Sequence, residues 1–182
     1  MEAISLPDLV SRCRVGDRKA QEHIFRSYYS DFLKVCLRYA HDEQGAEAML
    51  SDAFFKIFTK VDRYNRTGSF EGWMRRIVIN TCLTHLRNYP GEGDNPLPSD
   101  TESDDISPGL HATNDALSRI GLQELTQLIQ SLPTMSRTVF NLYIFEGYSH
   151  KEIAVSLGIT EGTSHWHVSN ARRWLKSKLL TA

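Results

Sequence analysis

Residues 156–179 read SLGITEGTSHWHVSNARRWLKSKL, with a glycine near the start followed by apolar and basic side chains at helical spacing. Just before this stretch, SHKE at residues 149–152 has the S-x-x-E spacing of a capping box, which begins a helix. Gly158 suits the left-handed turn that ends such a helix, and a further helix is predicted from near Thr160 to about Leu180. Two helices joined by so tight a turn are typical of a helix-turn-helix.

The second of these helices would present its N-terminal half to a DNA major groove. Its predicted core stripe is Val168, Ala171, Leu175 and Leu179, and the side chains off this stripe are of types that bond to bases and phosphates. The candidate DNA-contacting residues of this recognition helix are Thr163, His165, Trp166, His167, Ser169, Asn170, Arg172 and Arg173.

The same stretch permits two other interpretations. Helix pairs with a glycine turn also occur in proteins that never touch DNA, so a purely structural role stays open. A metal site is disfavoured, because His165 and His167 are two positions apart and point to different faces of a helix.

The rest of the chain is also helical in pattern, since sustained period-two alternation and Asn-Gly or Asp-Gly hairpin turns are absent from the sequence. Helix caps are expected at Asp17 and Ser69. Helices are predicted near residues 6–15, over 17–39, 46–61 and 69–86, from 117 to Pro133, and over 134–147. We therefore predict an all-α fold.

Residues 90–109 interrupt this pattern. They hold four of the six prolines and no Lys or Arg, and their acidic residues are Glu92, Asp94, Asp100, Glu102, Asp104 and Asp105. Such a segment cannot bury enough apolar area to offset the entropy of ordering it. We predict two small helical domains, at residues 1–89 and 115–182, joined by a flexible acidic linker at 90–114.

Charge, cysteine content and hydropathy together indicate in which compartment the protein works. The formal net charge of −1 identifies no partner, although segments on both sides of the linker are rich in Lys and Arg. An odd number of cysteines, Cys13, Cys36 and Cys82, without a C-x-x-C motif favours free thiols in a reducing cytosol. Neither a signal peptide nor an apolar run of about 18 residues occurs, so we expect a cytoplasmic protein with no membrane span.

Motifs for catalysis are also missing from the sequence. It contains no Gly-rich phosphate loop, no metal-ligand cluster and no nucleophile beside a convincing base. We therefore expect a protein that is not an enzyme and that needs no cofactor or metal.

Two long segments carry a family resemblance. SLPTMSRTVFNLYIFEGYSHKEIAVSLGITEGTSHWHVSNARRWLKSKL, at residues 131–179, resembles the C-terminal domain of extracytoplasmic-function (ECF) sigma factors, small initiation subunits of bacterial RNA polymerase. AEAMLSDAFFKIFTKVDRYNRTGSFEGWMRRIVIN, at 46–80, is similar to that family's polymerase-binding and promoter-melting domain. The resemblance covers roughly residues 17–87 and 128–180. It implies that the first domain binds the polymerase clamp and the minus-ten element, and that the second binds the minus-thirty-five element.

The resemblance also implies site residues in the first domain. The helix matching residues 47–58 docks on the clamp coiled coil of the largest polymerase subunit, so the candidate polymerase contacts are Glu47, Asp52, Phe55 and Lys56. The chain departs from the family pattern at Ala48 and Ser51, where an acid and Gln are usual. The segment that captures a flipped minus-ten base and holds the melted strand implies Asn65, Arg66, Thr67, Ser69, Arg75, Arg76 and Asn80.

Partners and alternatives follow from the same resemblance. The expected partners are core polymerase, through its clamp and flap region, promoter DNA, and an anti-sigma factor or other recruiting partner. The acidic linker is expected to pass through a basic channel of polymerase and to mimic nucleic acid there.

At His165–His167 the family more often has basic or amide residues, which leaves open a sigma-like adaptor placed on DNA mainly by a partner. A helix-turn-helix regulator that is not a sigma subunit is the other alternative.

Overall fold

The computed structural model describes residues 5–89 and 119–179, with side chains described from residue 124 onward in the second range. Every regular element in these ranges is a helix, as the sequence predicts. The predicted linker at 90–114 lies outside the described residues. The helices are α1 (Leu6–Arg14), α2 (Arg18–Tyr39), α3 (Glu43–Thr59), a 3-10 turn η1 (Val61–Arg63), α4 (Phe70–Asn88), α5 (Arg119–Gln130), α6 (Thr134–Ile144), α7 (His150–Leu157) and α8 (Glu161–Leu179).

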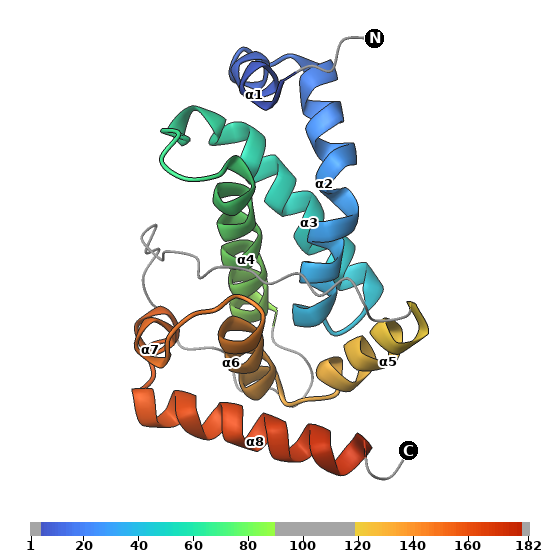
Figure 1. Ribbon diagram of the computed structural model, residues 1–182, viewed down its shortest axis with the longest axis vertical. Coiled ribbons are helices and arrows are strands. Elements are labelled where there is room, and N and C mark those ends of the chain that lie inside the picture. Colours follow the sequence, from blue (N-terminus) through green and yellow to red (C-terminus); the bar gives the residue numbers. More distant parts are fainter. Residues whose placement is uncertain (1–4, 90–118, 180–182) are drawn as a thin grey trace.

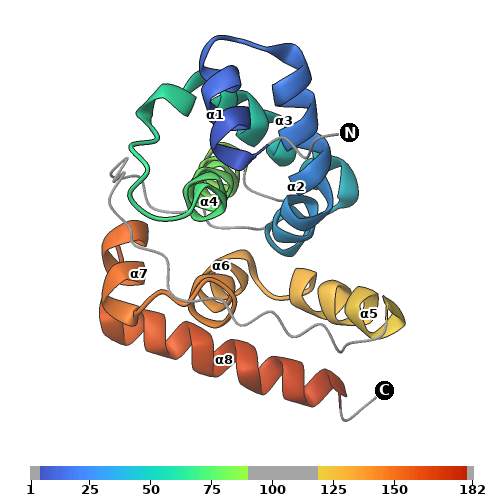
Figure 2. The same cartoon turned by 45° about the horizontal axis from the view of Figure 1, so that its top comes forward.

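The described helices lie in three layers (Figures 1 and 2). The N-terminal half, α1–α4, forms the first layer, in which α2, α3 and α4 pack against one another and α1 packs on α2. Helices α5, α6 and α7 form a middle layer, and α8 runs beneath them as the third. We refer to α5–α8 as the C-terminal half.

Local sequence signals begin the helices where predicted. Asp17 Oδ1 accepts hydrogen bonds from the amides of Lys19 and Ala20 at 2.9 and 3.3 Å, and Ser69 Oγ accepts one from Gly72 at 3.0 Å. Each bond satisfies an amide that has no partner within its helix. Helix α3 begins earlier than its apolar stripe predicts, because Asp42 caps it by accepting a hydrogen bond from the Gly45 amide at 2.7 Å.

The helix-turn-helix is formed by α7 and α8. Both bonds of the predicted capping box are present: the Glu152 amide donates to Ser149 Oγ at 3.2 Å, and the Ser149 amide donates to the Glu152 carboxylate at 2.8 Å. Gly158 ends α7 with φ 63° and ψ 32°, in the left-handed region. The predicted stripe of α8 is buried at Val168, Ala171 and Leu175, but Leu179 is 61% exposed, so its assignment to the core was wrong.

The two halves pack against each other, which the sequence patterns did not indicate. One cluster of buried apolar residues extends from α1–α4 into α6, α7 and α8, where it includes Val139, Leu142 and Ile153. A smaller cluster, Ile129, Leu132, Phe140, Ala171 and Leu175, belongs to the C-terminal half. The described residues thus comprise the two helical bodies that the sequence predicts, and these bodies share one apolar cluster.

The left-handed turn yields a matched pair of substitutions. Gly158→Ala places a Cβ in a conformation that disfavours it, and we expect it to lower the free energy of unfolding by about 1 kcal/mol. Gly162→Ala lies in the first turn of α8, where a Cβ meets only Thr160 Oγ1 at 3.7 Å, and should leave stability unchanged or raise it by about 0.5 kcal/mol. Urea denaturation of both variants measures the difference, and equal effects would contradict the assigned turn.

Candidate nucleic-acid and polymerase interface

The candidate residues of the recognition helix do not share one environment. His165, Trp166, Ser169, Arg172 and Arg173 are exposed, whereas Thr163, His167 and Asn170 are half-buried. Trp166 is the most conspicuous of the exposed group, since 57% of this large apolar residue is in contact with solvent. An exposed indole can stack on a base or a sugar, so its position fits a nucleic-acid contact.

Two of the histidines take part in packing within the C-terminal half. The His165 ring packs on His150 in a tilted arrangement with ring centroids 3.6 Å apart, and His150 in turn stacks on Tyr143 at 4.3 Å. His167 Nδ1 lies 2.9 Å from Ser136 Oγ on α6, within hydrogen-bonding distance. These contacts orient α8 on α6 and α7, so the histidines serve the fold of the motif as well as its surface.

The pKa values of two histidines are shifted by their surroundings. Burial lowers the pKa of His150 below its ordinary value of 6.5, and the adjacent His165 lowers it further. Burial also lowers the pKa of His167. Both rings are therefore neutral at pH 7 and add no fixed charge for phosphate binding.

The predicted base-capturing loop is exposed over residues 65–69. Asn65 Oδ1 accepts hydrogen bonds from the amide and hydroxyl of Thr67, at 3.1 and 2.6 Å, which closes a small turn. Arg66, at the tip of this turn, has φ 64°, in the left-handed region that side chains rarely adopt. Its guanidinium is thereby presented to solvent on a turn whose shape is fixed from within.

An aromatic cluster supports this loop. Tyr64 packs on Phe70 and Trp73 with ring centroids 5.1 and 5.6 Å apart, and its hydroxyl donates to the Gly68 carbonyl at 2.8 Å. Rings packed at these distances hold the two ends of the loop at fixed positions. The exposed polar residues 65–69 are thus held by the packed rings of Tyr64, Phe70 and Trp73.

The other predicted strand-binding residues, Arg75, Arg76 and Asn80, lie on α4 and are half-buried. Arg75 is bound to Glu146 of the C-terminal half: its Nε donates to Oε2 at 2.7 Å and its Nη2 to Oε1 at 3.2 Å. The loop residues and the α4 residues therefore differ, since the loop is exposed and the α4 residues are half-buried. Sequence reasoning missed Glu146, because no local signal connects two residues 71 positions apart.

The predicted polymerase-docking face lies on α3. Glu47, Asp52 and Phe55 are exposed, with Phe55 at 71%, and Lys56 is half-buried beside them. His85 of α4, which sequence reasoning also missed, has its Nε2 2.6 Å from the Asp52 carboxylate. An exposed phenyl ring flanked by acidic side chains is suited to docking on a partner helix.

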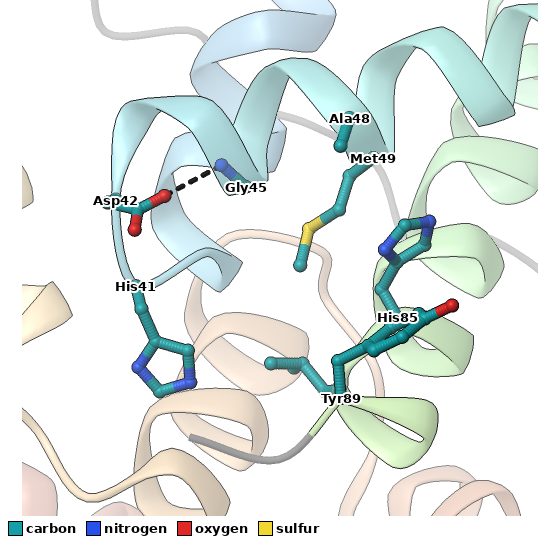
Figure 3. A pocket seen from close by; sticks show the side chains of 8 residues that line it. His41, Asp42, Gly45, Ala48, Met49, His85 and Tyr89 are labelled. Atoms are coloured by element: carbon teal, nitrogen blue, oxygen red, sulfur yellow. Dashed lines mark hydrogen bonds between the residues drawn. The ribbon is translucent and has the colours of Figure 1, made fainter. Parts of the chain in front are cut away.

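A cavity of about 420 Å³ lies between the N-terminal end of α3 and the C-terminal end of α4. Figure 3 shows Met49 and Ala48 on one side of it and His85 and Tyr89 on the other. It is lined by His41, Asp42, Gly45, Ala48, Met49, His85, Leu86 and Tyr89. Ala48 is one of the two positions at which the sequence differs from the resembled family, in which an acidic residue is usual. Its methyl side chain lines this cavity.

Within the part of the chain that the structure describes, no group of three or more His, Cys, Asp and Glu residues is placed to hold a metal ion. None of the helices there combines the length and the apolar character needed to cross a bilayer.

Comparison with known proteins gives two family matches and clear relatives. The model of Sigma-70 region 2 matches residues 24–89, and that of Sigma-70, region 4 matches residues 122–175. The chain is 31% identical over 180 residues to RNA polymerase sigma-H factor of Pseudomonas aeruginosa, covering 94% of this chain and 92% of that protein. It is 26% identical over 182 residues to ECF RNA polymerase sigma-E factor of Escherichia coli, with coverages of 94% and 92%.

A solved structure agrees with the fold. The sigma factor RpoE from Bartonella quintana, in complex with the anti-sigma factor NepR, superposes with a TM-score of 0.52 at 20% identity. The superposition covers 87% of this chain and 95% of that chain. At this level of identity the likeness supports the arrangement of helices and nothing more.

The lowered pKa values of His150 and His167 predict a pH-dependent stability. The unfolded chain binds protons at these residues near the ordinary pKa of 6.5, whereas the folded chain binds them only at lower pH. The free energy of unfolding should therefore be highest above pH 6.5 and decrease as the pH falls toward about 5. Denaturation across this range should show a smaller decrease for the double variant His150→Gln/His167→Gln. His23→Gln, on the exposed surface of α2, is the control, and an unchanged slope in the double variant would contradict the assignment.

Proposed function

The chain belongs to the extracytoplasmic-function (ECF) family of RNA polymerase sigma factors, and on that premise we propose how its two halves divide the work of promoter-specific initiation. The N-terminal half binds core polymerase through α3 and holds the melted minus-ten strand through the 65–69 loop and α4. The C-terminal half binds the minus-thirty-five element through α8. The protein acts as a non-catalytic initiation subunit and works in the cytoplasm, where polymerase and promoters are found.

The observation that carries this proposal is the presence of both sigma regions, 2 and 4, in one chain. A regulator with only a helix-turn-helix would have no use for a region 2 domain, so that alternative loses support. The relative RpoE is bound to an anti-sigma factor in its solved structure, and we extend to this chain the proposal that an anti-sigma factor is among its partners.

Polymerase docking is assigned to the α3 face formed by Glu47, Asp52, Phe55 and Lys56. The His85 contact holds the Asp52 carboxylate in one orientation, which lowers the entropy lost when a cationic partner group binds it. The apolar cavity beside Ala48 extends this face toward α4 and can accept an apolar side chain of the partner.

The two halves differ in the number of fixed positive charges that they offer to DNA. The 65–69 loop and α4 offer Arg66, Arg75 and Arg76, whose fixed charges suit the phosphates of a single strand. At the tip of α8 the neutral His167 adds no fixed charge, and the cations Arg172 and Arg173 come a turn or more after His165.

One observation favours a second candidate, a sigma-like adaptor that a partner positions on DNA. His167 bonds to Ser136 and the His165 ring packs on His150, so fewer side chains at the tip of α8 remain for bases. Run-off transcription with core polymerase alone on a library of promoters separates the two. A sigma factor selects a shared upstream sequence, and an adaptor does not without its partner.

Charge reversal on α3 tests the docking face. We expect Asp52→Arg, and separately the double variant Phe55→Ala/Lys56→Glu, to weaken binding to core polymerase by about tenfold or more, because like charges meet in the complex. Asp31→Arg, an equally exposed acidic residue of α2, is the matched control and should bind normally. Pull-down with circular dichroism measures binding and helicity, and normal recovery of polymerase by both variants would refute the docking face.

Substitutions in the loop and on α4 test strand capture. Arg66→Gly removes the guanidinium while relieving a left-handed backbone that costs about 1–2 kcal/mol, so a loss of function cannot be attributed to misfolding. We expect Arg66→Gly and Asn80→Ala to reduce open-complex formation by about tenfold, with a smaller effect on initial binding. Permanganate footprinting beside filter binding measures both steps. Arg26→Ala on α2 is the control, and normal melting by both variants would show that the assignment is wrong.

A further inference from the structure

Arg14, the last residue of α1, bonds to the segment that joins α3 to α4. Its Nη2 donates to the Tyr64 carbonyl at 2.5 Å, and Tyr64 is the residue directly before the 65–69 loop. Arg14 is half-buried and Tyr64 is only 8% exposed, so water competes little for this contact. A hydrogen bond from a charged donor in such surroundings is stronger than one between neutral groups.

The position of α1 is determined by its own packing. The helix packs on α2 and on η1, the turn that immediately precedes the loop segment, and Figures 1 and 2 show it beside the connection from α3 to α4. Three of its side chains are buried: Leu9, Val10 and Cys13. Arg12 Nη2 lies 2.7 Å from Asp17 Oδ2, an ion pair that closes the turn into α2. The helix that carries Arg14 is therefore held in place independently of the loop.

The contacts of the loop are of two kinds. The hydrogen bonds described above join residues 64–68 to one another, so they determine the shape of this segment but not where it lies relative to the surrounding helices. Its placement depends on contacts from outside the segment, which are made by the rings of Phe70 and Trp73 and by the guanidinium of Arg14. The rings hold the Tyr64 side chain, whereas Arg14 holds the backbone at which the loop begins.

We propose that Arg14 is a positioning residue for promoter melting, which holds the 65–69 loop where a base flipped out of the duplex can enter it. This inference rests on the proposed role of the loop in binding the melted strand. Each group that must be ordered when the base binds reduces affinity, so a loop that is already in place binds it more tightly. Helix α1 thereby takes part in initiation, although it lies before residues 24–89, which the Sigma-70 region 2 model matches.

Three variants of the full-length chain test this inference. Arg14→Ala removes the donor and keeps a good helix former, and Arg14→Lys keeps a cationic donor on a long side chain. Arg12→Ala is the matched control, because it removes an arginine two positions away on α1 and breaks the ion pair with Asp17. It loosens the same helix without removing the donor to Tyr64.

The contact itself is measured in the free protein by nuclear magnetic resonance. The chemical shift of the Tyr64 carbonyl carbon is read through the amide of Asn65, and it moves upfield when the carbonyl loses a hydrogen bond. We expect this upfield change in Arg14→Ala, and a shift close to that of the parent in Arg14→Lys and in Arg12→Ala.

Melting is measured by permanganate footprinting beside filter binding, with core polymerase and a promoter duplex that the unsubstituted chain selects from the run-off library. We expect Arg14→Ala to reduce melting about fivefold, with a much smaller effect on initial binding. Arg14→Lys should restore most of the melting. Arg12→Ala should melt the promoter like the parent, even where urea denaturation shows that it lowers stability.

Normal melting by Arg14→Ala would overturn the inference. Equal losses of melting in Arg14→Ala and Arg12→Ala would also overturn it, because a loosened α1 would then explain both. If Arg14→Ala does not fold, as judged by circular dichroism, Arg14→Gln takes its place, since its amide keeps a polar group at this position but ends short of the Tyr64 carbonyl.

The sigma assignment is judged separately. If the unsubstituted chain with core polymerase melts none of the promoters in the library, the proposed function fails. If the unsubstituted chain melts its promoter and Arg14→Ala melts it equally well, only the inference fails.

Discussion

A carboxylate that is removed from water must be paired, and Glu146 meets this requirement with two arginines from the opposite half of the chain. A buried pair of this kind adds little net stability, because the cost of desolvating the charges offsets much of their attraction. The contact is directional, since this docking of the halves places both Arg38 and Arg75 on the same carboxylate. The shared apolar core supplies the non-directional attraction, and the charged contact selects the arrangement.

The helices were largely predictable because the signals that define them are local. Asp17, Ser69 and Ser149 each bond to amides two or three residues ahead, so a short window of sequence contains the whole cap. The apolar spacing of α2, α3 and α4 is likewise visible within each segment. The prediction failed at Leu179, since periodicity shows which face of α8 is apolar but not how far the neighbouring helices extend to cover it.

The candidate sites were predictable in position but not in environment. The sequence indicates that Arg75 and His167 are polar residues on helices, and the family resemblance assigns them to DNA. The structure places one against Glu146 and the other beside Ser136, which are 71 and 31 positions away. Partners at such distances are set by tertiary packing, so no local pattern reveals them. The 65–69 loop differs, because its conformation depends on hydrogen bonds within the loop and on the neighbouring rings of Tyr64, Phe70 and Trp73.

The order in which the chain is synthesised gives the contact between the halves a further consequence. Arg75 leaves the ribosome 71 residues before Glu146, and at about 5–20 residues per second this interval lasts about 4–14 s. The contacts among α2, α3 and α4 are closer in sequence than those that join the halves, so the N-terminal half is free to fold during this time. Each newly made chain therefore passes through a period in which Arg75 has been made but Glu146, the carboxylate that will bind it, has not.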